Sequence, residues 1–234
     1  MLALVVEDDP DYASIIEYTL KRGGHEVVVA LSSAAALGFC RRKRPELALL
    51  DIRLPDGSGY ELCKTLRKAN PELPVLFLSS LDSPASVVEG LQQGGDDYVT
   101  KPFHPSELLA RVAAVTRRTG RASTGSAEAA PTIEASGFVV DLDAATARFL
   151  GQDIPCTPTE IEILAELLTY PGEVLSYQFL TNKIWGYSNV HDSTMLKGHV
   201  SALRRKLREA GVPEHLVQTV HNVGYTFMPE MDGE

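Results

Sequence analysis

The 234-residue chain lacks any long hydrophobic run. No apolar stretch approaches the roughly 18 residues that a membrane-spanning helix needs, so the sequence predicts no membrane span. The amino terminus also lacks the basic residues that begin a secretory signal peptide, because the apolar run Leu2–Val6 leads directly into Glu7, Asp8 and Asp9. We therefore expect a first β-strand there, in a protein that stays in the cytoplasm.

Cysteine is scarce. The chain has three cysteines, Cys40, Cys63 and Cys156, which are far apart and odd in number. Disulfide frameworks and zinc sites use cysteines in pairs or in close clusters. We therefore expect reduced thiols, with neither a disulfide nor a zinc site.

An excess of positive charge is also absent. The formal net charge is -9, which argues against indiscriminate binding to nucleic acid. Residues 134–234 hold 7 Lys and Arg against 14 Asp and Glu, so the deficit lies mainly in the second half. Five of those seven cations nevertheless fall within the stretch 197–208. The local arrangement of charge therefore says more about binding than the total does.

The length and the ordinary composition favour two globular domains. The stretch after residue 118 is rich in Gly, Ser and Ala and has no apolar periodicity. We expect domains over 1–118 and 133–234, joined by a flexible linker over 119–132. Such a linker transmits little torque. Regulation of the second domain by the first would then proceed by dimerisation or by masking through direct contact, and the sequence leaves both open.

The first half alternates short apolar runs with longer segments of helical periodicity. This order predicts an α/β fold, a doubly wound five-stranded parallel sheet with helices on both faces. The expected strands are Leu2–Val6, Glu26–Ala30, Leu47–Asp51, Val75–Ser79 and Tyr98–Thr100. If the first strand lies between the second and the third, the ligand-binding crevice falls at the ends of the first and third strands.

Asp51 ends the most apolar of these runs. Pro55, Asp56, Gly57 and Gly59 follow almost at once and stop the strand. Asp51 alone could equally be a residue that merely turns the chain. At the carboxyl edge of a parallel sheet, however, it would lie where open α/β folds bind their ligands.

Other chemically active side chains are expected at the same edge. Glu7 and Asp8 follow the first strand, and converging carboxylates suit Mg²⁺. Ser79 ends the fourth strand and Lys101 follows the fifth, which adds a hydroxyl and an ammonium group able to hold a phosphoryl group. An Asp nucleophile attacking a phosphoryl donor in this pocket would form an acyl phosphate.

These residues together resemble a two-component receiver domain. The resemblance identifies Asp51 as the phosphoacceptor, Ser79 as the switch hydroxyl, Tyr98 as the switch aromatic and Lys101 as the lysine that precedes Pro102 and Phe103. It implies phosphotransfer from a sensor histidine kinase. It also implies Mg²⁺, with Mn²⁺ as the alternative ion, held by Asp8, by Asp51, by the backbone carbonyl of Arg53 and by Glu7 through water.

Phosphorylation adds negative charge that would draw Ser79 and Lys101 inward and leave room for Tyr98 to swing in. The resemblance further implies a dimer face. Its apolar patch would consist of Val88, Leu91 and Leu109, with ion pairs of Asp97 with Arg111 and of Asp96 with Arg118. Val87 stands where a basic residue is usual, so Glu107 would lack its partner.

The second half begins with short alternating segments from Ile133 to Cys156, which predict a small antiparallel sheet. Thr157-Pro-Thr-Glu160 is a capping-box sequence and predicts a helix. Pro171-Gly172 would end that helix, Ser176 would cap a second helix through Trp185, and Asp192 or Ser193 would cap a third. Val217–Val220, a turn at Gly224 and Tyr225–Met228 would form a hairpin wing.

The third helix has two stripes. Leu196, Val200, Leu203 and Leu207 form an apolar stripe, and Lys197, Ser201, Arg204 and Arg208 repeat the same spacing one residue later. A helix anchored by the first stripe can lie in the major groove of double-stranded DNA with its cations on phosphates.

This half resembles the winged-helix effector domain of the OmpR/PhoB family. The resemblance rests on Thr157–Glu160, Ile184–Tyr187, His199–Leu207 and Gln218–Tyr225. It implies a transcription factor that dimerises on phosphorylation, contacts RNA polymerase and is not an enzyme, except toward its own phosphorylation and dephosphorylation. The DNA-contacting residues that it implies are Trp185, Lys197, Gly198, His199, Ser201, Ala202, Arg204, Arg208, Thr219, His221 and Tyr225.

Of these, Lys197, Gly198 and Ala202 are expected near bases, and Trp185, His199, Arg204, Thr219 and Tyr225 near phosphates. Lys197 and Gly198 replace the Asp and the apolar residue usual in the family, which predicts a different operator sequence. His221-Asn222 stands in the wing where a basic residue and Gly are common, so minor-groove contact would be weaker or dependent on pH.

Two rival functions remain open. An aspartate-nucleophile phosphatase or phosphotransferase would need a second acid two residues after Asp51, where the chain has Arg53. Alternatively, the winged helix could hold a protein, given the acidity of the second half. DNA binding differs from both rivals because its affinity must fall steeply with salt.

Overall fold

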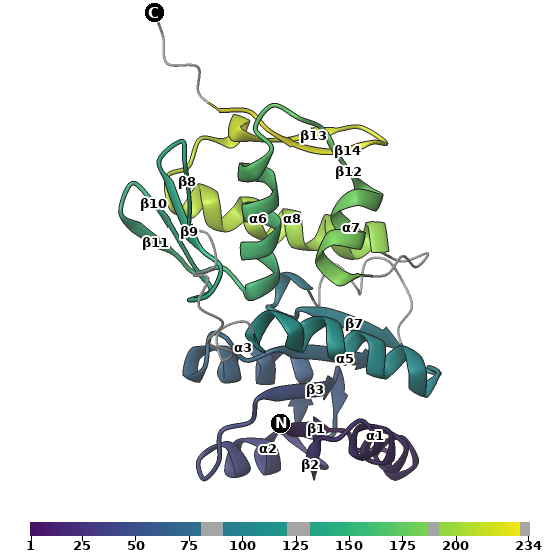
Figure 1. Ribbon diagram of the computed structural model, residues 1–234. Coiled ribbons are helices and arrows are strands. Elements are labelled where there is room, and N and C mark those ends of the chain that lie inside the picture. Colours follow the sequence, from purple (N-terminus) through teal and green to yellow (C-terminus); the bar gives the residue numbers. More distant parts are fainter. Residues whose placement is uncertain (81–90, 121–131, 187–191, 230–234) are drawn as a thin grey trace, which may run out of the picture. The chain divides into compact units, whose positions relative to one another are not determined.

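The structure is a computed structural model that describes residues 1–80, 91–120, 132–186 and 192–229. The chain divides into two compact units, Met1–Thr119 and Gly120–Glu234. Figure 1 colours the first from purple to teal and the second from teal to yellow. Within the described ranges, no helix is both long and apolar enough to cross a membrane.

The first unit is built on a five-stranded parallel sheet with the strand order β2-β1-β3-β6-β7. The predicted place of the first strand, between the second and the third, is confirmed. The last strand starts one residue earlier than expected, at Asp97. The strands are β1 (Leu2–Val6), β2 (Glu26–Ala30), β3 (Leu47–Asp51), β6 (Val75–Ser79) and β7 (Asp97–Thr100).

Helices pack on both faces of this sheet. Ile16 and Leu20 of α1 and Leu108 and Val112 of α5 pack with alternate residues of the strands, which all point to one face. The remaining strand residues point to the other face of the sheet. There, the ring of Tyr60 in α3 packs edge-on against that of Phe77, with 5.1 Å between the ring centroids. The helices are α1 (Pro10–Arg22), α2 (Ser33–Cys40), α3 (Gly59–Ala69) and α5 (Pro105–Gly120).

Two predicted segments lie largely outside the residues that the structure describes. The helix expected between β6 and β7 falls largely on residues 81–90, which lie outside them. The expected linker, 119–132, lies mostly at 121–131, also outside them. Its ends are described: α5 continues to Gly120, and a strand begins at Thr132.

The chain turns sharply after β3. Two short strands, β4 (Arg53–Leu54) and β5 (Gly57–Ser58), form a small hairpin that the sequence analysis did not predict. Gly59 then lies so close to the end of β3 that an added Cβ would stand 2.0 Å from the carbonyl oxygen of Asp51. A side chain at position 59 would therefore displace the backbone that carries Asp51.

The same turn is tied to a second helix. The carboxylate of Asp56 accepts hydrogen bonds from the backbone N–H groups of Ser33 at 2.9 Å and Ala34 at 2.8 Å, at the start of α2. These two backbone bonds hold the pKa of Asp56 below its ordinary value. The loop that follows Asp51 is thus anchored to another element and is not a free surface turn.

The second unit contains the predicted antiparallel sheet, three helices and the hairpin wing. The sheet has the order β11-β10-β9-β8. Its strands are β8 (Thr132–Ala135), β9 (Phe138–Asp141), β10 (Thr146–Phe149) and β11 (Gln152–Ile154). They are followed by α6 (Pro158–Thr169), β12 (Leu175–Ser176), α7 (Tyr177–Trp185), α8 (Asp192–Glu209), the 3-10 turn η1 (Glu214–Leu216), β13 (Val217–Val220) and β14 (Gly224–Phe227).

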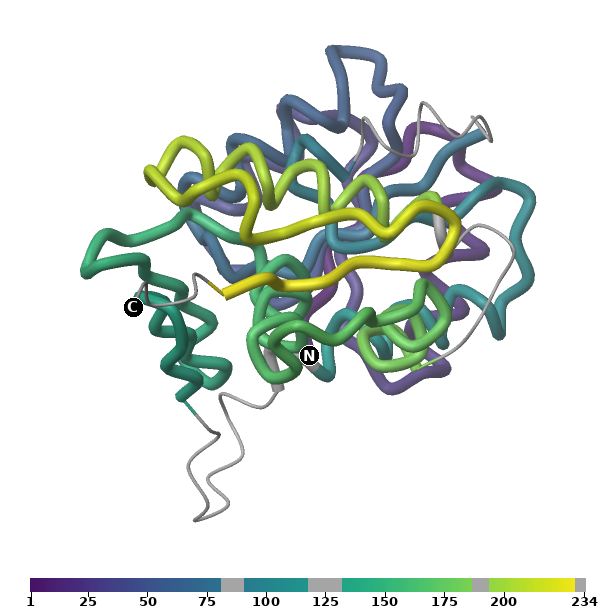
Figure 2. The backbone as a smooth tube through the Cα atoms, turned by 90° about the horizontal axis from the view of Figure 1, so that it is seen from above, coloured from purple at the N-terminus to yellow at the C-terminus, as the bar shows by residue number. Residues whose placement is uncertain are grey.

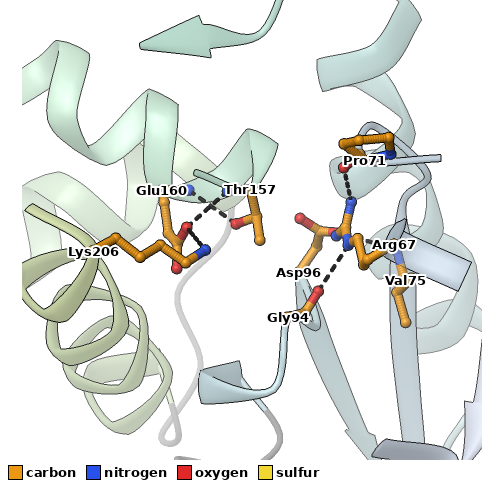
Figure 3. A network of polar contacts seen from close by, with 8 residues as sticks. All are labelled: Arg67, Pro71, Val75, Gly94, Asp96, Thr157, Glu160 and Lys206. Carbon is orange, nitrogen blue, oxygen red and sulfur yellow. Dashed lines mark hydrogen bonds and ion pairs between the residues drawn. The ribbon is translucent and has the colours of Figure 1, made fainter. Parts of the chain in front are cut away.

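The predicted capping box starts α6. Thr157 Oγ1 accepts from the backbone N–H of Glu160 at 3.4 Å, and the Glu160 carboxylate accepts from the N–H of Thr157 at 2.7 Å. Glu160 also bonds Lys206 Nζ of α8 at 2.5 Å, as Figure 3 shows. One buried carboxylate therefore both caps α6 and fixes α8 against it.

The wing differs from the expectation at its turn. Gly224 belongs to strand β14, and the left-handed residue of the turn is Asn222, with φ of 62°. Gly224 is required for a different reason. The short strand β12 pairs with β14, and a Cβ at Gly224 would stand 1.9 Å from the carbonyl oxygen of Leu175.

Candidate functional sites

Three carboxylates converge at the carboxyl edge of the parallel sheet. Glu7 and Asp8 follow β1, and Asp51 ends β3, its neighbour in the sheet. One carboxylate oxygen from each lies within 4.8 Å of the others. Glu7 and Asp51 are buried, whereas Asp8 is exposed. Asp9, the next acid, accepts backbone N–H bonds and caps α1.

Lys101 supplies the positive charge of this pocket. It follows β7, and its side chain is only 4% exposed. Its Nζ donates to Glu7 Oε2 at 2.5 Å and also to Asp51 Oδ2. The ring of Tyr12, from α1, lies 4.6 Å from the same Nζ. The ammonium group therefore holds two acids together and is shielded by an aromatic ring.

The pKa values reflect this packing. Burial raises the pKa of Glu7 to about 7, because desolvation and the nearby Asp51 charge outweigh the bond from Lys101. Burial alone would lower the pKa of Lys101, but its bonds to Asp51 and Glu7 raise it. Lys101 therefore stays charged at neutral pH, and it compensates part of the carboxylate repulsion.

The donor set fits a hard divalent cation. Carboxylate oxygens within a few ångströms of one another, one of them exposed to solvent, suit Mg²⁺, which binds proteins through one or two carboxylates and keeps several waters. The backbone N–H of Arg53 donates to Asp51 Oδ1 at 2.8 Å, which orients the carboxylate. The role expected for the Arg53 carbonyl, and the water-mediated role of Glu7, remain predictions.

Ser79 and Tyr98 lie near the same edge. Leu78 pairs with Asp51 in the sheet, so Ser79 is the next residue along the neighbouring strand. The carbonyl of Ser79 accepts from the N–H of Lys101 at 2.7 Å, and its side chain is buried. Tyr98 is 3% exposed, and its swing on phosphorylation remains a prediction.

In the second unit, α8 presents the two stripes that its sequence predicts. Leu196, Val200, Leu203 and Leu207 are all buried. Lys197, Ser201 and Arg208 are exposed. Arg205 is exposed on the same side of the helix, but it was not among the predicted contacts. Its position within the basic stretch 197–208 could have indicated it as a candidate DNA contact.

Arg204 is tied to the wing. Its guanidinium donates to the carbonyl of Val217 at 2.8 and 3.1 Å and to Thr219 Oγ1 at 2.9 Å. It also lies 5.5 Å from the centre of the Tyr225 ring. Figure 2 shows the yellow hairpin running beside α8. Arg204 thus connects the helix to the wing, a role that its position in the basic stripe did not reveal.

Several residues that were predicted to contact DNA are buried. Trp185 and His199 are 1% and 0% exposed, with ring centroids 5.6 Å apart, so both side chains pack inside the unit. Gly198 and Ala202 are also buried. Tyr225 is 3% exposed, and burial raises its pKa to about 12. In this conformation these side chains are little exposed, and their contact with DNA remains a prediction.

The tip of the wing is exposed to solvent. Thr219, His221 and Asn222 are exposed, and the side chain of Val223 is 46% exposed. The predicted contacts that the structure leaves accessible, or half-accessible for Arg204, are therefore Lys197, Ser201, Arg204, Arg208, Thr219 and His221. Their contact with DNA remains a prediction.

Several residues of the expected dimer face form ion pairs within the chain. Arg111 pairs with Asp97 at 2.9 Å and with Glu107 at 3.1 Å, whereas the contacts of these residues across a dimer remain predictions. Asp96 is buried and bonds Arg67 Nη2 of α3, which also holds the carbonyls of Gly94 and Pro71, as Figure 3 shows.

The remaining residues of that face give a mixed result. Leu91 is 1% exposed, and Leu109 packs partly buried against the core. The expected apolar patch remains a prediction. Val88 and the side chain of Arg118 lie outside the described part of the chain. Within the chain Asp96 bonds Arg67, and the expected pair of Asp96 with Arg118 remains a prediction.

Comparison with known proteins matches both halves. Residues 3–113 match the family described as Response regulator receiver domain, and residues 151–227 match Transcriptional regulatory protein, C terminal. The chain is 37% identical over 226 residues to the transcriptional regulatory protein AfsQ1 of Streptomyces coelicolor, covering 97% of each chain. It is 38% identical over 222 residues to the transcriptional regulatory protein PrrA of Mycobacterium tuberculosis, covering 95% of this chain and 94% of the relative.

A solved structure agrees with these matches. Response regulator DrrB of Thermotoga maritima, described as an OmpR/PhoB homolog, is 28% identical with a TM-score of 0.50, over 97% of this chain and 98% of that one. Together with the acidic pocket and the winged helix, these matches decide the class. The chain belongs to the OmpR/PhoB family of two-component response regulators and acts as a DNA-binding transcriptional regulator, not as a catalytic enzyme.

Proposed function

We propose that Asp51 is the phosphoacceptor through which a sensor histidine kinase controls this regulator. The observation that carries the proposal is the position of Lys101, whose buried ammonium bonds both Asp51 and Glu7 at the edge where the acidic residues converge. No similar group of three metal-ligating carboxylates occurs elsewhere among the described residues.

The geometry supports an in-line transfer. The bond between phosphorus and the kinase imidazole nitrogen breaks as an Asp51 carboxylate oxygen bonds to phosphorus. Glu7, Asp8 and Asp51 would hold Mg²⁺ or Mn²⁺, which supplies neutralisation of phosphoryl charge when bound. The N–H of Arg53 fixes one Asp51 oxygen, and Lys101 is placed to bond the new phosphoryl oxygens.

The same contacts suggest how the signal leaves the pocket. Before transfer, the ammonium group of Lys101 donates hydrogen bonds to the carboxylates of Glu7 and Asp51. A phosphoryl group on Asp51 adds new acceptor oxygens, so the hydrogen bonds of Lys101 must rearrange. The N–H of Lys101 bonds the carbonyl of Ser79, and Tyr98 pairs with Phe77, two residues before Ser79, in the sheet. A shift of Lys101 would therefore reach β6 and β7 through the backbone.

For the second unit, we propose that α8 enters the major groove of double-stranded DNA. Arg205 and Arg208 would contact phosphates and Lys197 would approach bases, while the wing tip around His221 would approach the neighbouring minor groove. Two chains would occupy tandem half-sites about one helical turn apart. Phosphorylation would favour that dimer, and the bound pair would contact RNA polymerase in the cytoplasm.

The experiment compares Asp51→Asn with a matched control, Asp11→Asn, which removes an exposed carboxylate from the first turn of α1. Each full-length variant is treated with a small phosphodonor and Mg²⁺, and its affinity for genomic DNA fragments selected by the phosphorylated protein is measured. We expect the unmodified protein and Asp11→Asn to gain at least about tenfold in affinity and Asp51→Asn to gain none. An equal gain in all three would refute Asp51 as the control point.

A further inference from the structure

A basic pocket opens at the edge of the first unit opposite Asp51. It lies where α2 ends and β3 begins, and four consecutive cations contribute to it. Its cavity volume is about 370 Å³. Strand β3 separates it from the phosphorylation site, since the four residue steps from Leu47 to Asp51 span roughly 13 Å. The basic pocket is lined by Cys40, Arg41–Pro45, Leu66, Ala69, Asn70 and Leu73.

The cations of this pocket have few partners. Arg41, Arg42, Lys43 and Arg44 are all exposed. Only Lys43 has an acidic partner in the described chain, Glu26, at 3.7 Å and between two exposed groups. Glu46, the adjacent acid, instead accepts from the N–H of Leu2 at 2.6 Å. Three guanidinium groups thus stand together without a carboxylate in a protein of net charge -9.

The end of α2 accounts for only part of this arrangement. A helix carboxyl terminus favours one or two nearby cations, and Arg41 is the C-cap of α2. It does not require a cavity beside them. The pocket also has an apolar floor, because Leu66 and Leu73 are buried beneath it and Ala69 contributes a methyl group.

We propose that the basic pocket binds a nucleoside polyphosphate. Guanidinium groups bind phosphate oxygens in bidentate fashion and stack on aromatic planes. The apolar floor suits a base, and Asn70 offers both a donor and an acceptor to its edge. The volume is within the range of small-molecule sites. A concave site of this size favours a small phosphorylated ligand over a flat polyanionic surface.

The test uses full-length protein and ATP in the presence of EDTA, so that the acidic pocket around Asp51 cannot bind the nucleotide through a metal. Binding is measured by calorimetry for Arg42→Gln/Arg44→Gln and for a control of equal charge loss, Lys64→Gln/Lys68→Gln. Both control lysines are exposed and lie on the other side of α3. We expect at least a tenfold loss of affinity in the arginine variant and less than a twofold change in the control.

Two further measurements identify the ligand class. Ala69→Phe fills the floor without changing charge and should weaken ATP binding while leaving tripolyphosphate binding unchanged. Cys40 lines the pocket, so bound ATP should slow its alkylation and leave Cys63, a buried residue of α3, unaffected.

The proposal fails if ATP does not bind at millimolar concentration, or if both double variants lose affinity equally. It also fails if tripolyphosphate binds as tightly as ATP, because the pocket would then recognise the phosphate charge and not the nucleoside. Binding of a poly-glutamate peptide in place of ATP, lost in the arginine variant, would assign the surface to an acidic protein and also overturn it.

Discussion

At the scale of single residues, the backbone around Asp51 is as constrained as its side chain. The Arg53 amide fixes one carboxylate oxygen, and Gly59 packs directly against the Asp51 carbonyl. Lys101 and Glu7 close the other side. The Asp51 carboxylate is therefore held by contacts from three separate parts of the chain.

Gly59→Ala tests the close approach. An added Cβ 2.0 Å from the Asp51 carbonyl oxygen must push the backbone aside, so we expect a loss of about 1–3 kcal/mol in stability and slower phosphorylation. Gly38→Ala is the control, because its Cβ would meet nothing within 4 Å and it lies in α2. That variant should gain about 0.5–1 kcal/mol.

Thermal unfolding of both variants measures the difference, with the rate of labelling by a small phosphodonor as the second readout. If Gly59→Ala matched the unmodified protein in both, the packing of the turn against β3 would not matter to the site.

Much of the residue-level site was predictable, because strand-end positions fix which side chains meet. Asp51 and Glu7 end adjacent parallel strands, and the order of apolar runs places them together. Contacts set by side-chain reach were not predictable. Nothing in the sequence near Asp56 indicates that it caps α2, and His199 sits among cations although its side chain is buried.

At the scale of elements, α8 is held on two sides. Lys206 bonds the capping carboxylate Glu160 at the start of α6, and Arg204 bonds the wing strand β13. A helix that reads a groove must keep its orientation relative to the other contacting parts. Two of the five clustered cations thus position the helix and are not simply a charged face.

Arg204→Ala should therefore loosen the wing. The loss of bonds to Val217 and Thr219 is expected to speed amide exchange in β13 about tenfold, equivalent to about 1.4 kcal/mol of local stability. Affinity should fall for all DNA sequences alike. Hydrogen exchange and DNA titration provide the two readouts.

Arg205→Ala is the matched control, since it removes the same charge from the exposed face. It should leave exchange in β13 unchanged while lowering the salt dependence of DNA binding by about one phosphate contact. Unchanged exchange in Arg204→Ala would show that the bond from α8 does not hold the wing.

The starts of helices could be predicted from the sequence where a capping residue marks them. The capping box at Thr157 starts α6 as expected, and Ser176 caps α7. The two-residue strands β4, β5 and β12 were missed because strands this short carry no periodicity. The role of Gly224 was misread as a turn because a close approach to Leu175 depends on a strand far away in the sequence.

At the scale of the whole molecule, each unit has its own core and its own site. The acidic pocket belongs to Met1–Thr119 and α8 to Gly120–Glu234. The expected routes of regulation between the two units are dimerisation and direct contact. Within one chain, Asp96 bonds Arg67 and Glu107 bonds Arg111, and the ion pairs expected across a dimer remain predictions.

The most direct test of the account is chemical mapping of the phosphorylated residue. Full-length protein is incubated with a small phosphodonor and Mg²⁺, reduced with borohydride so that an acyl phosphate becomes an alcohol, and sequenced by mass spectrometry. The account predicts homoserine at position 51, and its loss when EDTA replaces Mg²⁺. Homoserine at another acid, or undiminished modification in EDTA, would contradict it.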